Sequence, residues 1–384
     1  MTENNQVDFD RSLLPRQNSH FIGHQNAEYL IKMAFDNNRM PHAWLISGPK
    51  GVGKATLAFR FARYVLSNGE NKFTEKLPSG LFSDKLIEVE KGNDLDEGPL
   101  YISPNDPVFK RIANGGHADF MYVERTINEK TGKLRSEIVV DDVRPIGSFF
   151  HFTAGEGGWR IVVIDCADEM NIHAANAVLK VLEEPPPKAL LLLVCHNPGQ
   201  LLGTIRSRCR MLALQPLKKE IVSLLVRKWF PELEDDLVDP LIALANGSPG
   251  RAYNLGNGIG LEVYQDMMAL LGTLPSLDVE ALHSFSEKLI KNKEDDLFRM
   301  IFELLLWWIS RVIVSIGIDD SKFENLTKFE KNLMNQIGNS VGLDRWFRLW
   351  EKVNFLLKKS DQTNLDRKQV VLNVFLAIEN TVRL

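Results

Sequence analysis

A glycine-rich segment that ends in a lysine carries the strongest chemical signal in the sequence. Residues 48–54, GPKGVGK, have the spacing of a phosphate-binding loop. Three glycines would let backbone N–H groups point into one concavity: Gly48, Gly51 and Gly53. Lys54 would then reach the terminal phosphates of a nucleotide. The segment predicts a site for ATP or ADP with Mg²⁺, and a glycine-rich turn that binds no ligand is the alternative.

The position after this lysine departs from the usual pattern. A Ser or Thr there would hold Mg²⁺ through its hydroxyl, but the sequence has Ala55. Thr56 follows one residue later, and on a helix that shift rotates the side chain by roughly 100°. Thr56 is therefore a poor substitute, and the sequence predicts a loop that can hold a nucleotide without the usual metal ligand.

An acidic residue at the end of an apolar run could form the second half of a nucleotide site. Residues 161–164, IVVI, predict a buried strand, and Asp165 follows them. A carboxylate there could hold Mg²⁺ directly or through water, although a strand-ending cap is the alternative. An active hydrolase of this type usually has Glu next, to polarise the attacking water, whereas this chain has Cys166. We expect Asp168 and Glu169 to help start the next helix.

A third feature is an arginine between Ser207 and Cys209. At a sharp turn between strands, Arg208 would be a rigid cation that faces outward. Supplied to a neighbour's nucleotide, it would stabilise charge on the γ-phosphate as an arginine finger. The alternative is a surface arginine paired with a carboxylate, and spacing alone favours it. His196 and Asn197 end another strand, where they could sense a γ-phosphate or form an ordinary turn.

Composition limits the class of protein. The 384 residues are 44% hydrophobic and 25% charged, which is typical of globular chains with more than one domain. The net charge of −4 disfavours a free-standing nucleic-acid binder, so any DNA contact must be local or shared with partners. The polar first twenty residues lack a secretory signal. The apolar stretch 297–318 is interrupted by Glu303 and Arg311, so we expect a cytoplasmic protein with no membrane segment.

The cysteines and the order of the predicted elements narrow the class further. An odd set of three cysteines disfavours a disulfide framework and a four-cysteine zinc site, so no structural metal is expected. Apolar strands alternate with helices up to about residue 217, which predicts an α/β fold with a parallel sheet covered on both faces. The strands are expected at 43–48, 118–125, 159–165, 189–195 and 210–217. Only helices follow; we expect about three short ones over 218–255, broken by Pro231, Pro240 and 247–250.

Several of these runs together resemble one family. They are FIGHQ (21–25), PHAWLISGPKGVGKATLAFRFA (41–62), GGHADF (115–120), VVIDCADEMN (162–171), AANAVLKVLEEPPP (174–187) and TIRSRCRML (204–212). The chain resembles the delta-prime subunits of bacterial DNA polymerase III clamp loaders, which are of the AAA+ class. The resemblance covers the first 217 residues and the GSPGRA segment at 247–252, whereas the last 120 residues are similar only in being helical.

The resemblance implies an arrangement of domains and a function. A flexible tail (1–20) would precede an AAA+ P-loop α/β domain (21–215), a helical lid (216–260) and a helical collar for oligomerisation (261–384). Such subunits help to load the sliding clamp onto primed DNA, and they act as a rigid support beside motor subunits and a delta-type subunit. The irregular insertion at 67–116 has no cysteine, so the zinc module of many relatives is not expected.

The resemblance also assigns roles to residues. Arg208 corresponds to the arginine that is offered in trans to the ATP of a neighbouring motor subunit. Motor subunits carry a phosphate-sensing arginine where this chain has Gly250, and Arg251 comes one position late. An ATP-hydrolysing motor subunit or related AAA+ ATPase is the second hypothesis, and Ala55, Cys166 and Gly250 disfavour it. The third is an AAA+ DNA-binding initiator, which the acidic balance and the lack of a recognisable DNA-reading module disfavour.

Overall fold

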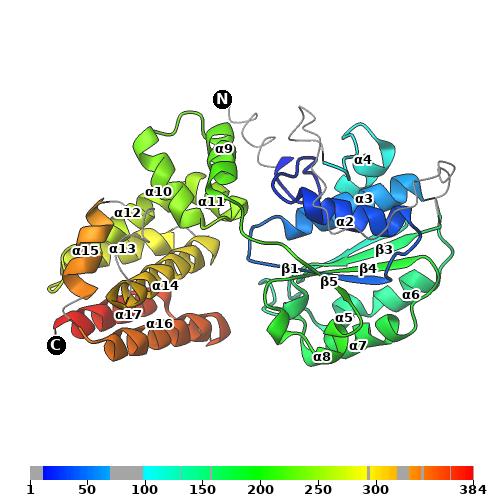
Figure 1. The fold of residues 1–384 in the computed structure, drawn as a ribbon. Coiled ribbons are helices and arrows are strands. Elements are labelled where there is room, and N and C mark those ends of the chain that lie inside the picture. The colour runs from blue at the N-terminus through cyan, green and yellow to red at the C-terminus, as the bar shows by residue number, and fades with distance from the viewer. Residues whose placement is uncertain are drawn as a thin grey trace. The chain divides into compact units, whose positions relative to one another are not determined.

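The computed structural model describes residues 12–69, 98–130, 132–155, 158–291, 295–317, 328–338, 341–363 and 365–383. The chain divides into two compact units, residues 1–218 and 219–384 (Figure 1). Most of the predicted insertion, residues 70–97, lies outside the described residues. Its end contains helix α4 (Pro107–Ala113).

A five-stranded sheet forms the centre of the first unit, and all of its neighbouring strands are parallel. Every residue of β1 and β4, two of the three inner strands of this sheet, is buried, which requires cover on both faces. The predicted parallel α/β sheet is therefore confirmed. Across the sheet the order is β2 (Phe120–Val123), β3 (Arg160–Ile164), β4 (Ala189–Cys195), β1 (Ala43–Ser47) and β5 (Arg210–Ala213).

Helices cover the two faces of this sheet (Figure 1). Successive side chains of a strand point to opposite faces, so β4 supplies both cores. Leu192 packs in one core with Leu57, while Leu191 packs in the other with Val178. One face carries α2 (Gln25–Asp36), α3 (Lys54–Asn68) and α4, and the other carries α5 (Val140–Val143), α6 (Pro145–His151), α7 (Ile172–Glu183) and α8 (Gly203–Arg206).

Two buried arginines of α3 hold part of the segment that we expected to be a flexible tail. Arg63 donates from Nη1 to the carbonyl oxygen of Asn18 at 2.8 Å, and Arg60 donates to that of Ser19. Arg60 also donates from Nε to Glu28 Oε1 at 2.7 Å, so its charge is paired inside the unit. The described part of the tail is thus anchored to the helix that follows the glycine-rich loop.

The structure corrects one detail of the predicted elements. Pro240 does not break a helix but is the sixth of the eleven residues of α10 (Asp235–Ala245). The helix continues past this proline with one backbone donor missing. Helix α5 begins at Val140, and Asp141 and Asp142 lie in its first turn. The Asp142 carboxylate accepts a hydrogen bond from the backbone N–H of Val139 at 2.9 Å.

The second unit contains only helices in the part of it that the structure describes. Its core includes large buried side chains such as Trp308 and Trp346. In the described ranges, no helix is both long and apolar enough to span a bilayer. The helices are α9 (Lys219–Trp229), α10, α11 (Pro249–Gly256), α12 (Gly260–Leu271), α13 (Val279–Lys291), α14 (Asp295–Gly317), α15 (Lys328–Gly338), α16 (Leu343–Thr363) and α17 (Arg367–Arg383).

Candidate functional site

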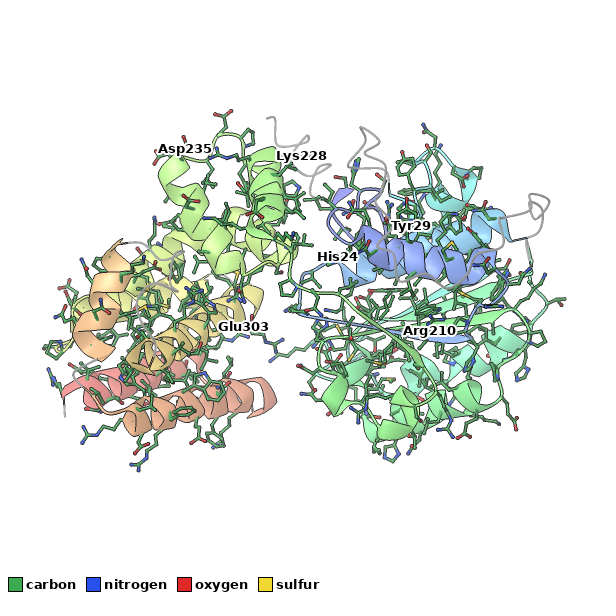
Figure 2. The ribbon with its side chains drawn as sticks, viewed as in Figure 1. His24, Tyr29, Arg210, Lys228, Asp235 and Glu303 are labelled. Carbon is green, nitrogen blue, oxygen red and sulfur yellow. The ribbon has the colours of Figure 1, made fainter. Side chains whose placement is uncertain are left out.

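The glycine-rich loop connects the end of β1 to the start of α3, as the sequence predicted. Gly48 and Gly53 have φ values of 145° and 100°, in the region that side chains rarely adopt. A Cβ on Gly48 would lie 2.4 Å from the Leu214 carbonyl oxygen, and one on Gly53 would lie 2.9 Å from the Phe21 ring. Both positions therefore need glycine. The loop also has a fixed neighbour in His24, whose Nε2 lies 3.1 Å from the Val52 carbonyl oxygen (Figure 2).

Lys54 is turned toward its own loop. Its side chain is almost completely buried, and Nζ donates to the carbonyl oxygens of Gly48 and Pro49, each at 2.7 Å. Burial lowers the pKa of this ammonium to about 8, although the nearby Asp165 carboxylate acts in the opposite direction. Two of its three N–H donors are thus used within the chain. A bound phosphate would have to replace these carbonyl contacts.

The next two positions place no hydroxyl where a metal ligand would stand. Ala55 has none, and the side chain of Thr56 is buried in the first turn of α3. On a helix the two side chains point about 100° apart. Glycines with positive φ and a nearby lysine fit a phosphate group, whereas this first turn does not fit the magnesium ion that usually accompanies it.

Asp165 directly follows β3, and both of its carboxylate oxygens have partners inside the protein. Oδ2 accepts a hydrogen bond from the Tyr122 hydroxyl at 2.9 Å, and Oδ1 accepts one from the Cys166 backbone N–H at 3.0 Å. Burial and the Asp165 charge raise the pKa of Tyr122 far above its ordinary value, so this phenol stays a donor. Sequence reasoning missed Tyr122; the available signal was the strand that contains it, which pairs with β3.

Cys166 adopts a left-handed backbone conformation with φ of 54°. Its Sγ lies 3.8 Å from Asp165 Oδ1 and 3.9 Å from His196 Nε2. Burial, reinforced by the Asp165 charge, raises the pKa of the thiol well above its usual range. Burial also lowers the pKa of His196, and Lys54 adds to that effect. Near pH 7 the thiol is therefore protonated, and it cannot take a proton from water as the usual glutamate would.

The prediction that Asp168 and Glu169 start the next helix is wrong. The Asp168 carboxylate accepts hydrogen bonds from the backbone N–H groups of His196 at 3.0 Å and Asn197 at 2.8 Å. Glu169 pairs with Arg125 at 2.9 Å. Asn171 caps α7, because its Oδ1 accepts from the Ala174 N–H at 2.9 Å. Asp168 therefore fastens the end of β4 to the turn after β3.

Arg208 follows the short helix α8, which replaces the direct turn between strands that the sequence suggested. Its Nη2 lies 2.9 Å from Glu183 Oε1 at the end of α7, and its Nη1 donates to the Thr204 carbonyl oxygen at 3.0 Å. The side chain is 35% exposed. Both features considered from the sequence are thus present, since the arginine is partly open to solvent and is paired with a carboxylate.

The sheet separates Arg208 from the glycine-rich loop. We call the edge where the parallel strands end the carboxyl edge and the edge where they begin the amino edge. The loop follows Ser47 at the carboxyl edge, whereas Arg210 pairs with Trp44 near the start of β1 (Figure 2). At about 3.3 Å per residue, these points lie about 10 Å apart along the strand, and Arg208 precedes Arg210. Arg208 therefore does not belong to the site formed by its own loop.

Known proteins share this chain's sequence features over the α/β unit. Residues 101–218 match the model of a family described as DNA polymerase III, delta subunit. A delta-prime subunit of DNA polymerase III from Pseudomonas aeruginosa is 33% identical over 221 residues, which cover 57% of this chain and 57% of that protein. The chain is therefore similar to DNA polymerase III delta-prime subunits over its α/β unit.

Two further relatives show how far the similarity extends. The delta-prime subunit of Escherichia coli K12 is 33% identical over 246 residues, or 64% of each chain. The tau subunit of the same organism is 24% identical over 321 residues, which cover 80% of this chain and 44% of that one. The match thus spans 57% to 64% of the length of these two delta-prime relatives.

The GSPGRA segment forms the start of α11. Gly250 offers no side chain, and Arg251 is half-buried in the helical unit. Burial lowers the pKa of Arg251, while the negative charge of Glu303 acts in the opposite direction. Within the described residues, its Nε and Nη2 atoms are buried without a hydrogen-bond partner. Arg251 therefore points into the helical unit and does not replace the side chain that Gly250 lacks.

Proposed function

We propose that this chain is a delta-prime subunit that helps to load the sliding clamp onto primed DNA during replication. It would act as a rigid member of a clamp loader that also contains motor subunits and a delta-type subunit. Its own ATPase activity would be absent or very weak. Its similarity to delta-prime subunits supports this role. The contacts of the charged side chains at the two sheet edges support the proposal that the chain is a rigid support and not a motor.

The observation that carries the proposal is the set of side chains and contacts at the carboxyl edge. Lys54 bonds to the carbonyl oxygens of its own loop, and position 55 offers no hydroxyl to a metal ion. The protonated thiol of Cys166 stands where a hydrolase needs a base. Positions 55 and 166 thus supply neither the hydroxyl ligand for Mg²⁺ nor the general base that ATP hydrolysis uses. The isolated chain should hydrolyse ATP at background rate. A robust rate that Lys54→Ala abolishes would contradict the proposal.

Nucleotide binding without hydrolysis is a separate part of the proposal. The backbone cradle of Gly48, Gly51 and Gly53 with Lys54 would hold ATP or ADP weakly, and Asp165 would be the nearest carboxylate to any accompanying Mg²⁺. Calorimetry should detect weak binding that Lys54→Ala removes. No heat of binding with ATP or ADP would mean that the loop is a turn that binds no ligand.

Arg208 would act at the amino edge as an arginine finger for the ATP of a neighbouring motor subunit. Its partial exposure and its distance from its own loop support this role. A planar guanidinium can grip two phosphate oxygens where charge develops during phosphoryl transfer.

The C-terminal helices would supply the assembly surface. We propose the division into an AAA+ domain (21–215), a lid (216–260) and a collar (261–384). Helix α16 exposes Leu343, Phe347 and Trp350, whose spacing puts them on one helix face, and exposed apolar patches usually mark partner sites. Phe347→Glu should weaken co-purification with motor subunits. Phe152→Glu, at an exposed phenylalanine of the first unit, is the matched control and should leave it intact.

A motor subunit is the alternative function. The tau relative favours it, because its alignment covers more of this chain than the delta-prime alignments do. One measurement distinguishes the two functions. If the chain is a motor, Lys54→Ala should lower the ATPase rate of the assembled clamp loader. If the chain is a support, the rate should not change.

A further inference from the structure

We propose that Glu183 is a positioning residue that holds the Arg208 guanidinium in place for a phosphate of the neighbouring subunit. This inference rests on the proposed role of Arg208. Glu183 Oε1 lies 2.9 Å from Nη2, and the Thr204 carbonyl oxygen accepts from Nη1 at 3.0 Å. The two contacts approach different nitrogens of one planar group, so they fix its direction as well as its distance.

Glu183 and Arg208 both lie on backbone that is anchored by its neighbours. Leu182, the residue before Glu183, is buried, and the prolines at 185–187 follow after Glu184. On the other side, Cys209 is buried next to Arg208, and the Ser207 hydroxyl donates to the Thr204 carbonyl oxygen at 3.1 Å. The pair therefore joins the end of α7 to the turn after α8 without depending on a mobile loop.

The place of Glu183 in its helix is unfavourable by itself. It is the last residue of α7, and Glu184 follows it, although the carboxyl end of a helix carries partial negative charge. A lysine or glutamine would suit this position better if only the stability of the helix mattered. Arg208 offsets the local repulsion, so the carboxylate is explained by the arginine that it contacts.

The two contacts leave most of the N–H donors of the Arg208 guanidinium available. Arginine has five N–H donors, and in the part of the chain that the structure describes, two of them have protein partners. With the side chain 35% exposed, the remaining donors can meet an anion from outside the chain. Because its direction is already fixed, the arginine would lose little side-chain freedom on meeting a phosphate.

The test uses reconstituted clamp loaders that contain the full chain, with DNA- and clamp-stimulated ATPase as the readout. The variants are Glu183→Ala, Glu183→Gln, Arg208→Ala and the double substitution. Glu184→Ala is the matched control, because it removes the neighbouring carboxylate from the same helix end. We expect Glu183→Ala to remove a large part, about two thirds or more, of the rate that Arg208→Ala removes. The effect should fall on kcat with KM for ATP unchanged, because the contact matters in the transition state.

Glu183→Gln keeps an acceptor oxygen and should recover part of the lost rate, while Glu184→Ala should behave as wild type. In the double variant, Glu183→Ala should add nothing to Arg208→Ala, because it acts through that residue. The melting temperature of each isolated variant should stay within about 3 °C of wild type, as expected for a half-exposed ion pair.

The outcomes separate this inference from the proposed function. A wild-type rate for Glu183→Ala beside a reduced rate for Arg208→Ala would overturn the inference and leave the finger intact. An equal loss from Glu184→Ala would also overturn it, because the effect would then be a general one of charge at the helix end. A wild-type rate for Arg208→Ala would refute the finger itself and with it the inference.

Discussion

The two edges of the sheet differ in what their charged groups contact. At the carboxyl edge, Lys54 bonds to carbonyl oxygens of its own loop, and Asp165 accepts from Tyr122 and from a backbone N–H. At the amino edge, Arg208 is partly exposed and is held by a single carboxylate and a single carbonyl oxygen. At the carboxyl edge, which has the motif of a nucleotide site, the charged side chains bond to groups of the same unit. At the amino edge, which lacks that motif, a charged side chain is partly open to solvent. A phosphate-loop motif therefore does not by itself leave its lysine directed toward a ligand.

The largest expected effect belongs to the amino edge. Arg208→Ala should leave assembly intact and lower the stimulated ATPase of the complex by about one site's share. At that one site an arginine finger is worth about 10³–10⁵ in rate, and the other ATP sites dilute the loss. Arg208→Lys should rescue poorly, because a point charge lacks the planar fork. Steady-state rates of reconstituted complexes measure both, and full rescue by lysine would argue for a merely electrostatic role.

The next effect compares one substitution at both edges. Gly48→Ala should lower the free energy of unfolding by about 2–4 kcal/mol, because its φ is positive and the new Cβ would meet the Leu214 carbonyl oxygen. Gly203→Ala, in α8 at the amino edge, should change it by less than about 1 kcal/mol, since the nearest atom lies 4.0 Å away. Urea unfolding measures the free energy of unfolding of both variants. Equal losses would contradict the expected difference in packing between the two edges.

The pH dependence of nucleotide binding tests the carboxyl edge. Only the protonated form of Lys54 attracts phosphate, and burial lowers its pKa to about 8. The protonated fraction falls about tenfold between pH 7 and pH 9, so affinity for ATP should weaken by up to about tenfold over that range. Calorimetry at a series of pH values measures it. Unchanged affinity from pH 7 to pH 9 would mean that this ammonium does not contact the ligand.

The smallest effect concerns the hydrogen bond that occupies Asp165. Tyr122→Phe removes the donor to Oδ2 and should lower the free energy of unfolding by about 1 kcal/mol. ATPase of the isolated chain should stay at background, because Cys166 still provides no base. The matched control is Tyr29→Phe, at an exposed tyrosine of α2, which should be neutral. A measurable gain of hydrolysis in Tyr122→Phe would show that Asp165 is held inactive by this contact alone.

Local patterns in the sequence were sufficient for much of the fold. Strands β1 and β4 lie within a residue of their predicted bounds, because each is a continuous apolar run between polar segments. The cap of α7 by Asn171 is also local, since it depends on a side chain and a backbone N–H three residues away. The glycine-rich loop lies between a strand and a helix, which the motif requires.

The contacts that define the two edges could not be predicted in this way. Tyr122 meets Asp165 only because β2 is the neighbour of β3 in the sheet, and strand order is not a local property. Asp168 reaches the amides after β4 for the same reason. The contact between Arg208 and Glu183 depends on where two helices end in space. Sequence thus identified which residues carry charge, whereas the tertiary fold decides what each charge contacts.

The central claim is that this chain contributes an arginine to a neighbour's ATP site and no hydrolysis of its own. The most direct test compares three versions of the full chain in the reconstituted clamp loader: wild type, Lys54→Ala and Arg208→Ala. The measurement is the DNA- and clamp-stimulated ATPase rate of each assembly. We predict that Lys54→Ala leaves the rate unchanged, whereas Arg208→Ala lowers it by about one site's share. A loss with Lys54→Ala and a wild-type rate with Arg208→Ala would contradict the account and identify the chain as a motor.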